Sequence, residues 1–293
     1  MPIDQGIISM QSLTSGPNAL KNVDLSQPSV ARVYDYYLGG SSNWAVDREF
    51  ADRVLEAFPL FRDIAVANRS FHHRVVHDLA RRGIRQFLDV GAGIPREGST
   101  HRMADEVVPD CRVVYVDNEP VAVAHAEILV DEEGDPDRHA VVNGDLREPD
   151  RLWRDVYATG IIDPEQPVAL LMIAVLHVHQ PGKDGSDIWE QSVARYRELL
   201  PQGSYLALSH LTGDGVPPEI KAKLGQLKKM YDDSGNKVIC RRRDQICALL
   251  GNFEPLDPGM VWAPEWRPWG TPTRDGFATS NASAIWAGVA RKQ

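Results

Sequence analysis

A short apolar strand that runs directly into two glycines constrains the fold of this chain more than any other feature of the sequence. Residues 86–93 read Gln-Phe-Leu-Asp-Val-Gly-Ala-Gly. Glycine has no Cβ atom, so a strand that ends in Gly91 and Gly93 can turn tightly and bring backbone N–H groups close to a ligand. Folds that bind several kinds of nucleotide cofactor share this pattern, and so do turns that bind nothing.

Strands and helices alternate after this turn. Further strands are predicted at 112–116, 140–142, 168–175 and 204–209, with helices between them. The run 168–175 is the most apolar, which predicts a central strand buried on both faces. Two last β segments, 253–261 and 284–290, have no helix between them and are predicted to pair antiparallel. This order predicts a doubly wound α/β sheet that binds its ligand at the carboxyl ends of the strands.

The sequence before the first strand predicts an arm followed by helices. Residues 1–27 have no consistent hydrophobic period and are predicted to form a flexible arm. Three helices are predicted within 28–83, which we interpret as a helical cap or lid on a single α/β domain at 84–293. Six polar or aromatic residues of this cap are candidates to close over a ligand, although an aromatic helix face is often simply core: Tyr34, Tyr37, Asn43, Arg48, Asn68 and Arg69.

Composition excludes several classes of function. The net charge of −9 argues against nucleic acid as the main partner, and the run Arg241-Arg242-Arg243 is interpreted as solvated surface. Three cysteines without Cys-x-x-Cys spacing indicate neither a disulfide framework nor a zinc knuckle. Neither a membrane-spanning segment nor a signal peptide is recognisable, so a cytoplasmic protein without membrane partners is expected. The sequence does not indicate an oligomeric state.

Acidic residues at three strand ends narrow the choice of ligand. A dinucleotide fold expects a third glycine three residues after the second, where this chain has Arg96. A carboxylate such as Asp117, after the second strand, can accept hydrogen bonds from ribose hydroxyls. Asp145, after the third strand, suits the adenine amino group, with Leu146 packing on the ring. Together with Asp89, these residues disfavour NAD and favour S-adenosylmethionine.

The whole pattern resembles the class I S-adenosylmethionine-dependent methyltransferase fold. More closely, the chain is similar to an actinobacterial methyltransferase family that was formerly classed as a domain of unknown function. The matching stretches lie within about 27–290 and are residues 29–40 with Asn43 and 47–49, then 68–69, 87–93, 113–120, 176–177 and 206–210. The resemblance implies a seven-stranded sheet whose last strand is antiparallel. It also implies a cofactor held by Asp89, Gly91, Gly93, Asp117, Asn118, Asp145 and Leu146.

The expected reaction is methylation of an O or N atom of a small molecule. The fourth strand is followed by residues Ala174-Val175-Leu176-His177, and not by the Asp/Asn-Pro-Pro-aromatic sequence of nucleic-acid amino-methyltransferases. Displacement at a sulfonium depends mainly on positioning, and a base is needed only if the acceptor must lose a proton. Candidate bases are His177, His179 and His210, with cofactor lining as the favoured role of His177. Three tryptophans form either an acceptor wall or a structural loop: Trp262, Trp266 and Trp269.

Two alternatives remain open at this point. A protein that binds S-adenosylmethionine without turning it over, as a sensor or a partner of another protein, would carry the same acidic residues. An NAD-dependent oxidoreductase is disfavoured by Arg96 and by the missing third glycine.

Overall fold

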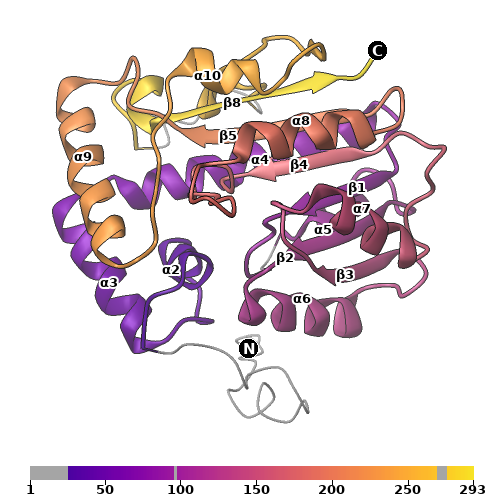
Figure 1. The fold of residues 1–293 in the computed structure, drawn as a ribbon, viewed down its shortest axis with the longest axis horizontal. Coiled ribbons are helices and arrows are strands. Elements are labelled where there is room, and N and C mark those ends of the chain that lie inside the picture. The colour runs from indigo at the N-terminus through magenta and orange to yellow at the C-terminus, as the bar shows by residue number, and fades with distance from the viewer. Residues whose placement is uncertain (1–25, 96–97, 269–275) are drawn as a thin grey trace, which may run out of the picture.

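The computed structural model describes residues 26–95, 98–268 and 276–293 (Figure 1). From residue 26 on, three helices precede the first strand, as predicted: α2 (Val30–Tyr37), α3 (Ala45–Ala57) and α4 (Phe61–Arg81). Nearly all of the predicted arm lies outside the described residues, as do Arg96 and Trp269. The division into an arm, a cap and an α/β domain stays a prediction.

The rest of the described chain alternates strands and helices. The strands are β1 (Gln86–Val90), β2 (Arg112–Asp117), β3 (His139–Asn143), β4 (Ala169–Ile173), β5 (Tyr205–Leu211), β6 (Glu254–Pro255), β7 (Val261–Trp262) and β8 (Ile285–Arg291). The helices are α5 (Thr100–Asp105), α6 (Pro120–Glu133), α7 (Pro149–Ala158), α8 (Trp189–Leu199), α9 (Pro218–Asp233) and α10 (Arg243–Ala248). No helix among the residues that the structure describes is long and apolar enough to cross a bilayer.

The sheet has the strand order β3-β2-β1-β4-β5-β8-β6, and β7 also pairs with β8. Strands β1 to β5 are parallel, and β8 runs antiparallel to β5 along its whole length. The predicted doubly wound sheet with an antiparallel last strand is therefore confirmed. The order reverses between β1 and β4, which is where ligands of such sheets bind.

The end of the sheet corrects one prediction. The expected strand 253–261 is divided into β6 and β7, so the sheet has eight strands instead of seven. Pro255 and Pro258 have no N–H group and cannot donate within a strand ladder, and the Gly259 N–H donates to the Leu256 carbonyl in a turn (2.6 Å). The break follows from these residues.

Side chains alternate between two hydrophobic cores, one on each face of the sheet. Phe87, Val113 and Leu171 pack on the face covered by α4 and α9, and Leu88 and Val114 pack on the face covered by α7, α8 and α10. Figure 1 shows α8 in front of the sheet and α4 behind it. Asp89 shares the face of Phe87, because residues two apart in a strand point the same way. A buried acid thus lies beside α4.

One predicted strand boundary differs from the structure at the site. Strand β4 ends at Ile173, two residues before the predicted end, because Ala174 has a left-handed backbone (φ 59°). The residues after Ile173 therefore form a loop.

Candidate cofactor and acceptor site

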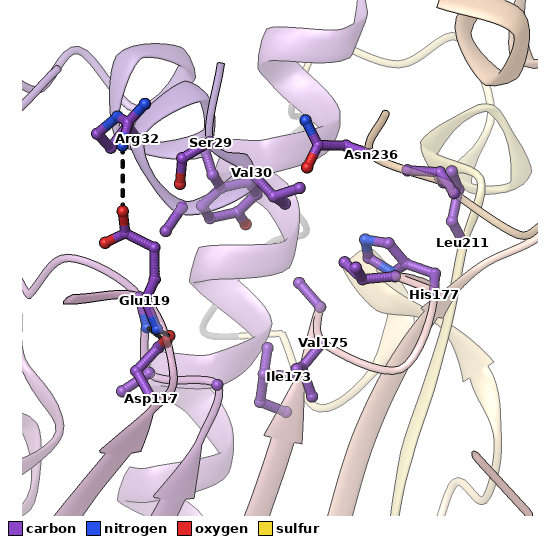
Figure 2. Close-up of a pocket in the computed structure, with 18 of the residues that line it drawn as sticks. Ser29, Val30, Arg32, Asp117, Glu119, Ile173, Val175, His177, Leu211 and Asn236 are labelled. Carbon is purple, nitrogen blue, oxygen red and sulfur yellow. Dashed lines mark hydrogen bonds and ion pairs between the residues drawn. The ribbon is translucent and has the colours of Figure 1, made fainter. Parts of the chain in front are cut away.

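A cavity of about 540 Å³ lies at the carboxyl ends of β1, β2 and β4. Its floor is formed by the turn after β1, residues 117–120 after β2, and residues 173–175. Its roof is formed by the start of α2, by Leu227 and Tyr231 of α9, and by Asn236. Figure 2 shows Ser29, Val30 and Asn236 on one side of this cavity, with Asp117, Ile173 and Val175 on the other. The position is the one that the strand order predicts for a ligand.

The glycine turn depends on two left-handed residues. Gly91 has a φ of +73°, and a Cβ atom there would lie 2.4 Å from Cγ2 of Val175. Gly93 has a φ of +65°, but a Cβ atom there would meet nothing within 4 Å. The Gly93 N–H donates to Asp117 Oδ2 (2.8 Å), which fixes the turn after β1 to the end of β2. At Gly91 and Gly93 the cavity is therefore bordered by backbone atoms without side chains.

Asp89 is a buried carboxylate in a polar network. The Thr100 hydroxyl donates to Asp89 Oδ2 (2.6 Å), and His72 Nε2 lies 3.2 Å from the same hydroxyl. Arg69 donates to His72 Nδ1 (3.1 Å), which assigns the His72 proton to Nε2 and makes that nitrogen a donor to Thr100. Burial raises the pKa of Asp89 to about 6 and lowers that of His72 well below its usual value. A cation entering the cavity would offset the cost of burying this carboxylate.

Asp117 is held by backbone donors at the next strand end. Its Oδ1 accepts from the Glu119 N–H (2.9 Å) and its Oδ2 from Gly93, while burial raises its pKa. Asn118 and Leu146 line the same cavity. The predicted residues of the glycine turn and of the second strand end therefore lie together.

Asp145 does not line this cavity, which corrects its predicted position. Its carboxylate accepts from Arg147 Nε (2.9 Å) and borders a second, smaller cavity of about 120 Å³. Gly144, Leu146 and Arg147 line the large cavity in its place. The nearby arginine draws the carboxylate away.

Tyr34 and Asn68 belong to a hydrogen-bond chain along the wall of the cavity. The Ala174 N–H donates to Ser209 Oγ (2.9 Å), and the Ser209 hydroxyl donates to Asn68 Oδ1 (2.6 Å). Asn68 Nδ2 donates to the Tyr34 hydroxyl (3.0 Å), which donates to the Ala65 carbonyl (3.2 Å). This chain connects α2, α4 and the ends of β4 and β5.

Tyr37, predicted to act beside Tyr34, points elsewhere. It is almost fully buried, and its hydroxyl lies 3.2 Å from the Tyr231 hydroxyl in the core behind the roof. Tyr231 lines the cavity, whereas Tyr37 does not. Helical spacing put Tyr34 and Tyr37 on the same face of α2 but could not decide which one reaches the cavity.

Two of the three candidate histidines line the cavity. They are His177 and His179, in the loop after β4 (Figure 2 shows the first). Burial, together with the charge of Arg241, lowers the pKa of His177 to about 4. Its Nδ1 is buried and has no hydrogen-bond partner within the described part of the chain. A neutral imidazole therefore faces the ligand space at neutral pH.

His210 is not brought into the site, which corrects the third histidine prediction. It is fully buried, its Nδ1 lies 2.7 Å from the Leu211 carbonyl, and its Nε2 lies 2.7 Å from Arg241. A carbonyl only accepts and a guanidinium only donates, so the proton is on Nδ1 and Nε2 is an acceptor. Both ring nitrogens are thus used inside the protein.

Arg241 supports the loop that carries His177. Its guanidinium stacks on Trp189 (3.7 Å to the ring centroid), donates to the Leu176 carbonyl (2.7 Å) and pairs with Asp187. It is only 5% exposed, so the interpretation of the arginine run as solvated surface is wrong for this residue. The sequence around Arg241 does not indicate this burial, because the residues that Arg241 contacts lie far away in the sequence.

Arg32 connects the roof to the floor of the cavity. Its Nε donates to Asp47 (2.8 Å) and its Nη1 to Glu119 (3.1 Å), the contact drawn as a dashed line in Figure 2. Asn236 Nδ2 donates to the Pro28 carbonyl (2.8 Å) on the other side of the same segment. Sequence reasoning did not single out these residues, since Arg32 and Glu119 are 87 positions apart.

The two described tryptophans of the predicted acceptor wall do not line the cavity. Trp266 is fully buried against Phe71 (5.4 Å between centroids), and Trp262 packs on Trp286 (5.0 Å). For these two the structural alternative holds.

The comparison with known proteins decides the family. A family described as S-adenosyl methyltransferase matches residues 17–293. The chain belongs to this family. A crystal structure of a Thermobifida fusca protein assigned as a methyltransferase is 33% identical, with 92% of this chain and 97% of that chain covered and a TM-score of 0.80. A DUF574 family protein from Streptomyces avermitilis is 31% identical, with 92% and 98% covered and a TM-score of 0.81. No curated protein matches.

The predicted family, the class I fold and S-adenosylmethionine as cofactor are thereby confirmed. The residues of this methyltransferase fit the cofactor on structural grounds. The cavity presents the buried carboxylate of Asp89 and the half-buried carboxylate of Asp117, which suit cationic and hydroxyl groups. Gly91 and Gly93 leave space that side chains would fill. The bound cofactor supplies a methyl group on a positively charged sulfur.

Proposed function

We propose that this methyltransferase acts on a small, largely apolar molecule that carries an oxygen or nitrogen nucleophile. This proposal rests mainly on the part of the cavity that lies beyond the glycine turn. There it is lined by apolar side chains under a roof, namely Val175, Val178, Leu211, Leu227, Val238 and Ile285. A cavity of this volume accommodates small ligands, and a covered apolar wall suits a small acceptor better than a polymer.

The lining of the cavity supports a proposed set of cofactor contacts. We assign Asp117 and Asn118 to the ribose and Leu146 to the adenine ring, since all three line the cavity. Asp89, held from below by Thr100, is placed for the cationic amino group of the methionine part. Arg69, which lines the cavity, is fixed by the Gly98 carbonyl (2.6 Å) and supports this network. Asp145 is left out, because Arg147 holds it outside.

The transfer itself requires little acid–base chemistry. The bound cofactor would supply its methyl group to the oxygen or nitrogen of the acceptor and leave as S-adenosylhomocysteine. An acceptor that must lose a proton would pass it to a histidine of the loop after β4, His177 or His179. Holding the two partners in line without water supplies most of the acceleration. His177, neutral at pH 7, can accept a hydrogen bond from the acceptor but is a weak base, so it orients more than it deprotonates. His179 is the second candidate in the same loop.

Calorimetry tests the cofactor part of the proposal. S-adenosylmethionine and S-adenosylhomocysteine should bind with one site per chain, and NAD should not bind. Absence of binding by the first two would overturn the assignment of this cavity.

Release of S-adenosylhomocysteine tests the acceptor. A panel of small phenols, amines and carboxylic acids should contain at least one substrate that is methylated with saturable kinetics. Methylation restricted to DNA, RNA or protein would contradict the small-acceptor proposal. Tight cofactor binding without turnover on any of these would favour the alternative of an idle binding protein.

A further inference from the structure

His73, His77 and Glu106 meet where α4 packs on α5. The two histidines are one helical turn apart on α4, and Glu106 directly follows α5. Glu106 Oε2 lies 3.3 Å from His73 Nε2 and 2.7 Å from His77 Nε2. One possible ligand atom from each residue lies within 4.8 Å of the other two. The side chains are 31%, 10% and 52% exposed, so solvent reaches the cluster.

We propose that these three residues form a zinc site. Histidines at positions i and i+4 of a helix project from the same face. Two imidazole nitrogens and one carboxylate oxygen are a donor set used by zinc sites that keep one position open. With zinc–ligand bonds of about 2.0–2.1 Å, tetrahedral ligands lie roughly 3.3 Å apart, which is the separation of His73 and Glu106. The shorter contact to His77 lengthens with a small shift of the exposed glutamate.

The competing explanation is a pair of hydrogen bonds. Without a metal, both Nε2–H groups donate to one carboxylate oxygen, which also accounts for the observed distances. Zinc would take the place of those two hydrogens on Nε2, and each neutral imidazole would then carry its proton on Nδ1. The positive charge of Arg69 acts on His73 and opposes a cation, which predicts moderate affinity. Nitrogen donors also predict that Ca²⁺ and Mg²⁺ do not compete.

The proposed zinc site lies close in the sequence to residues that support the cofactor cavity. Helix α4 provides His72, and α5 begins at Thr100, and these two residues support the Asp89 carboxylate. A metal that joins His73 and His77 to Glu106 would hold the two helices together. The inference concerns metal binding alone and does not depend on the identity of the acceptor.

Calorimetry on the untagged full chain, after treatment with a chelator, tests the site. We expect one Zn²⁺ per chain and a Co²⁺ complex with the absorption of tetrahedral coordination. His73→Ala and Glu106→Gln should each weaken binding by about tenfold or more. Both side chains are exposed enough that these variants should fold, which thermal unfolding without metal checks.

Two control variants make the outcome decisive. Glu132→Gln removes an exposed acid of α6, and His179→Gln removes one of the histidines that line the cavity. Neither variant should change the affinity for zinc. His77→Ala provides a third test if it folds. No zinc binding by the wild type, or binding that is lost in His179→Gln and kept in His73→Ala, would overturn the proposal.

Discussion

The buried Asp89 carboxylate destabilises the free protein, and we propose that it stabilises the complex with the cofactor. Its usual pKa of 3.8 rises to about 6 on folding, so the unfolded chain loses this proton at lower pH than the folded one. Asp89 therefore does not reduce the stability of the folded state below about pH 4, and its contribution to stability falls as the pH rises through about 6. The difference between the two pKa values of Asp89 corresponds to a loss of at most about 3 kcal/mol of folding stability at neutral pH.

Asp89→Asn should consequently raise the free energy of unfolding at pH 7 and have little effect at pH 4. The same variant should bind S-adenosylmethionine more weakly, because the cationic amino group loses its partner. Urea unfolding at several pH values and calorimetry measure the two effects. Asp131→Asn, on the exposed side of α6, is the matched control. A variant that is less stable at pH 7 would contradict the account.

The two turn glycines provide a second test at this scale. Gly91→Ala combines a left-handed backbone, which costs about 1–2 kcal/mol, with a clash against Val175. Gly93→Ala has the backbone cost alone, because nothing lies within 4 Å. We therefore expect a larger loss of stability in Gly91→Ala, measured by chemical denaturation. Combining it with Val175→Ala should restore part of the loss, and equal effects of the two single variants would contradict the clash.

The acids and glycines near the first two strand ends could be predicted because the chemistry of the ligand requires them at fixed positions. Asp145 followed the same rule and still missed the cavity, since Arg147, two residues later, pairs with it. His210 was placed by its strand end, but its orientation depends on Arg241, which is 31 positions away. The pairing of His210 with Arg241 is decided by packing and leaves no trace in the local sequence.

At the scale of elements, helix α2 is the roof of the cavity. The turn after α2 is held by one buried acid: Asp35 Oδ2 accepts from the Ser42 N–H (3.0 Å) and from Asn43 Nδ2 (2.8 Å). A Cβ atom at Gly40 would lie 1.9 Å from Asp35, so the two-glycine turn after α2 has a structural reason. The residues around this turn therefore hold α2 in place beside the cavity.

Glu119→Gln should weaken the link between roof and floor. The variant removes the charge that faces Arg32 but keeps an oxygen that can accept from the Ala122 N–H at the start of α6. We expect the cofactor to dissociate several-fold faster with little change in melting temperature, since Arg32 keeps Asp47. Stopped-flow displacement measures the rate, and Glu56→Gln on the exposed face of α3 is the control. An unchanged rate would mean that α2 does not limit release.

Element order was predictable from hydrophobic periodicity, whereas two strand ends were not. The residues of β4 are apolar up to position 176, but the left-handed Ala174 ends the strand at Ile173. The Ser209 hydroxyl, which accepts from the Ala174 N–H, belongs to the neighbouring strand. Strand β6 ended early for a local reason, the prolines at 255 and 258, which the apolar pattern had outweighed.

For the whole molecule, the cavity joins segments that are far apart in the chain but close in the fold. Bound S-adenosylhomocysteine should slow hydrogen exchange in residues 29–34, 91–93, 117–120 and 173–180, which surround it. Helices α7 and α8 cover the opposite face of the sheet and should change little beyond the general gain in stability. Hydrogen exchange by mass spectrometry measures this pattern. Protection centred on α8 would place the cofactor elsewhere.

The hydrogen-bond chain from Ala174 to Ala65 has one direction, because each member donates forward and accepts from behind. The Tyr34 proton is committed to a carbonyl, and burial raises the pKa of this phenol. Tyr34 therefore cannot exchange protons with an acceptor. The rate of methyl transfer should show no tyrosine ionisation, and its profile should stay flat on the alkaline side up to about pH 9 when the acceptor itself does not titrate.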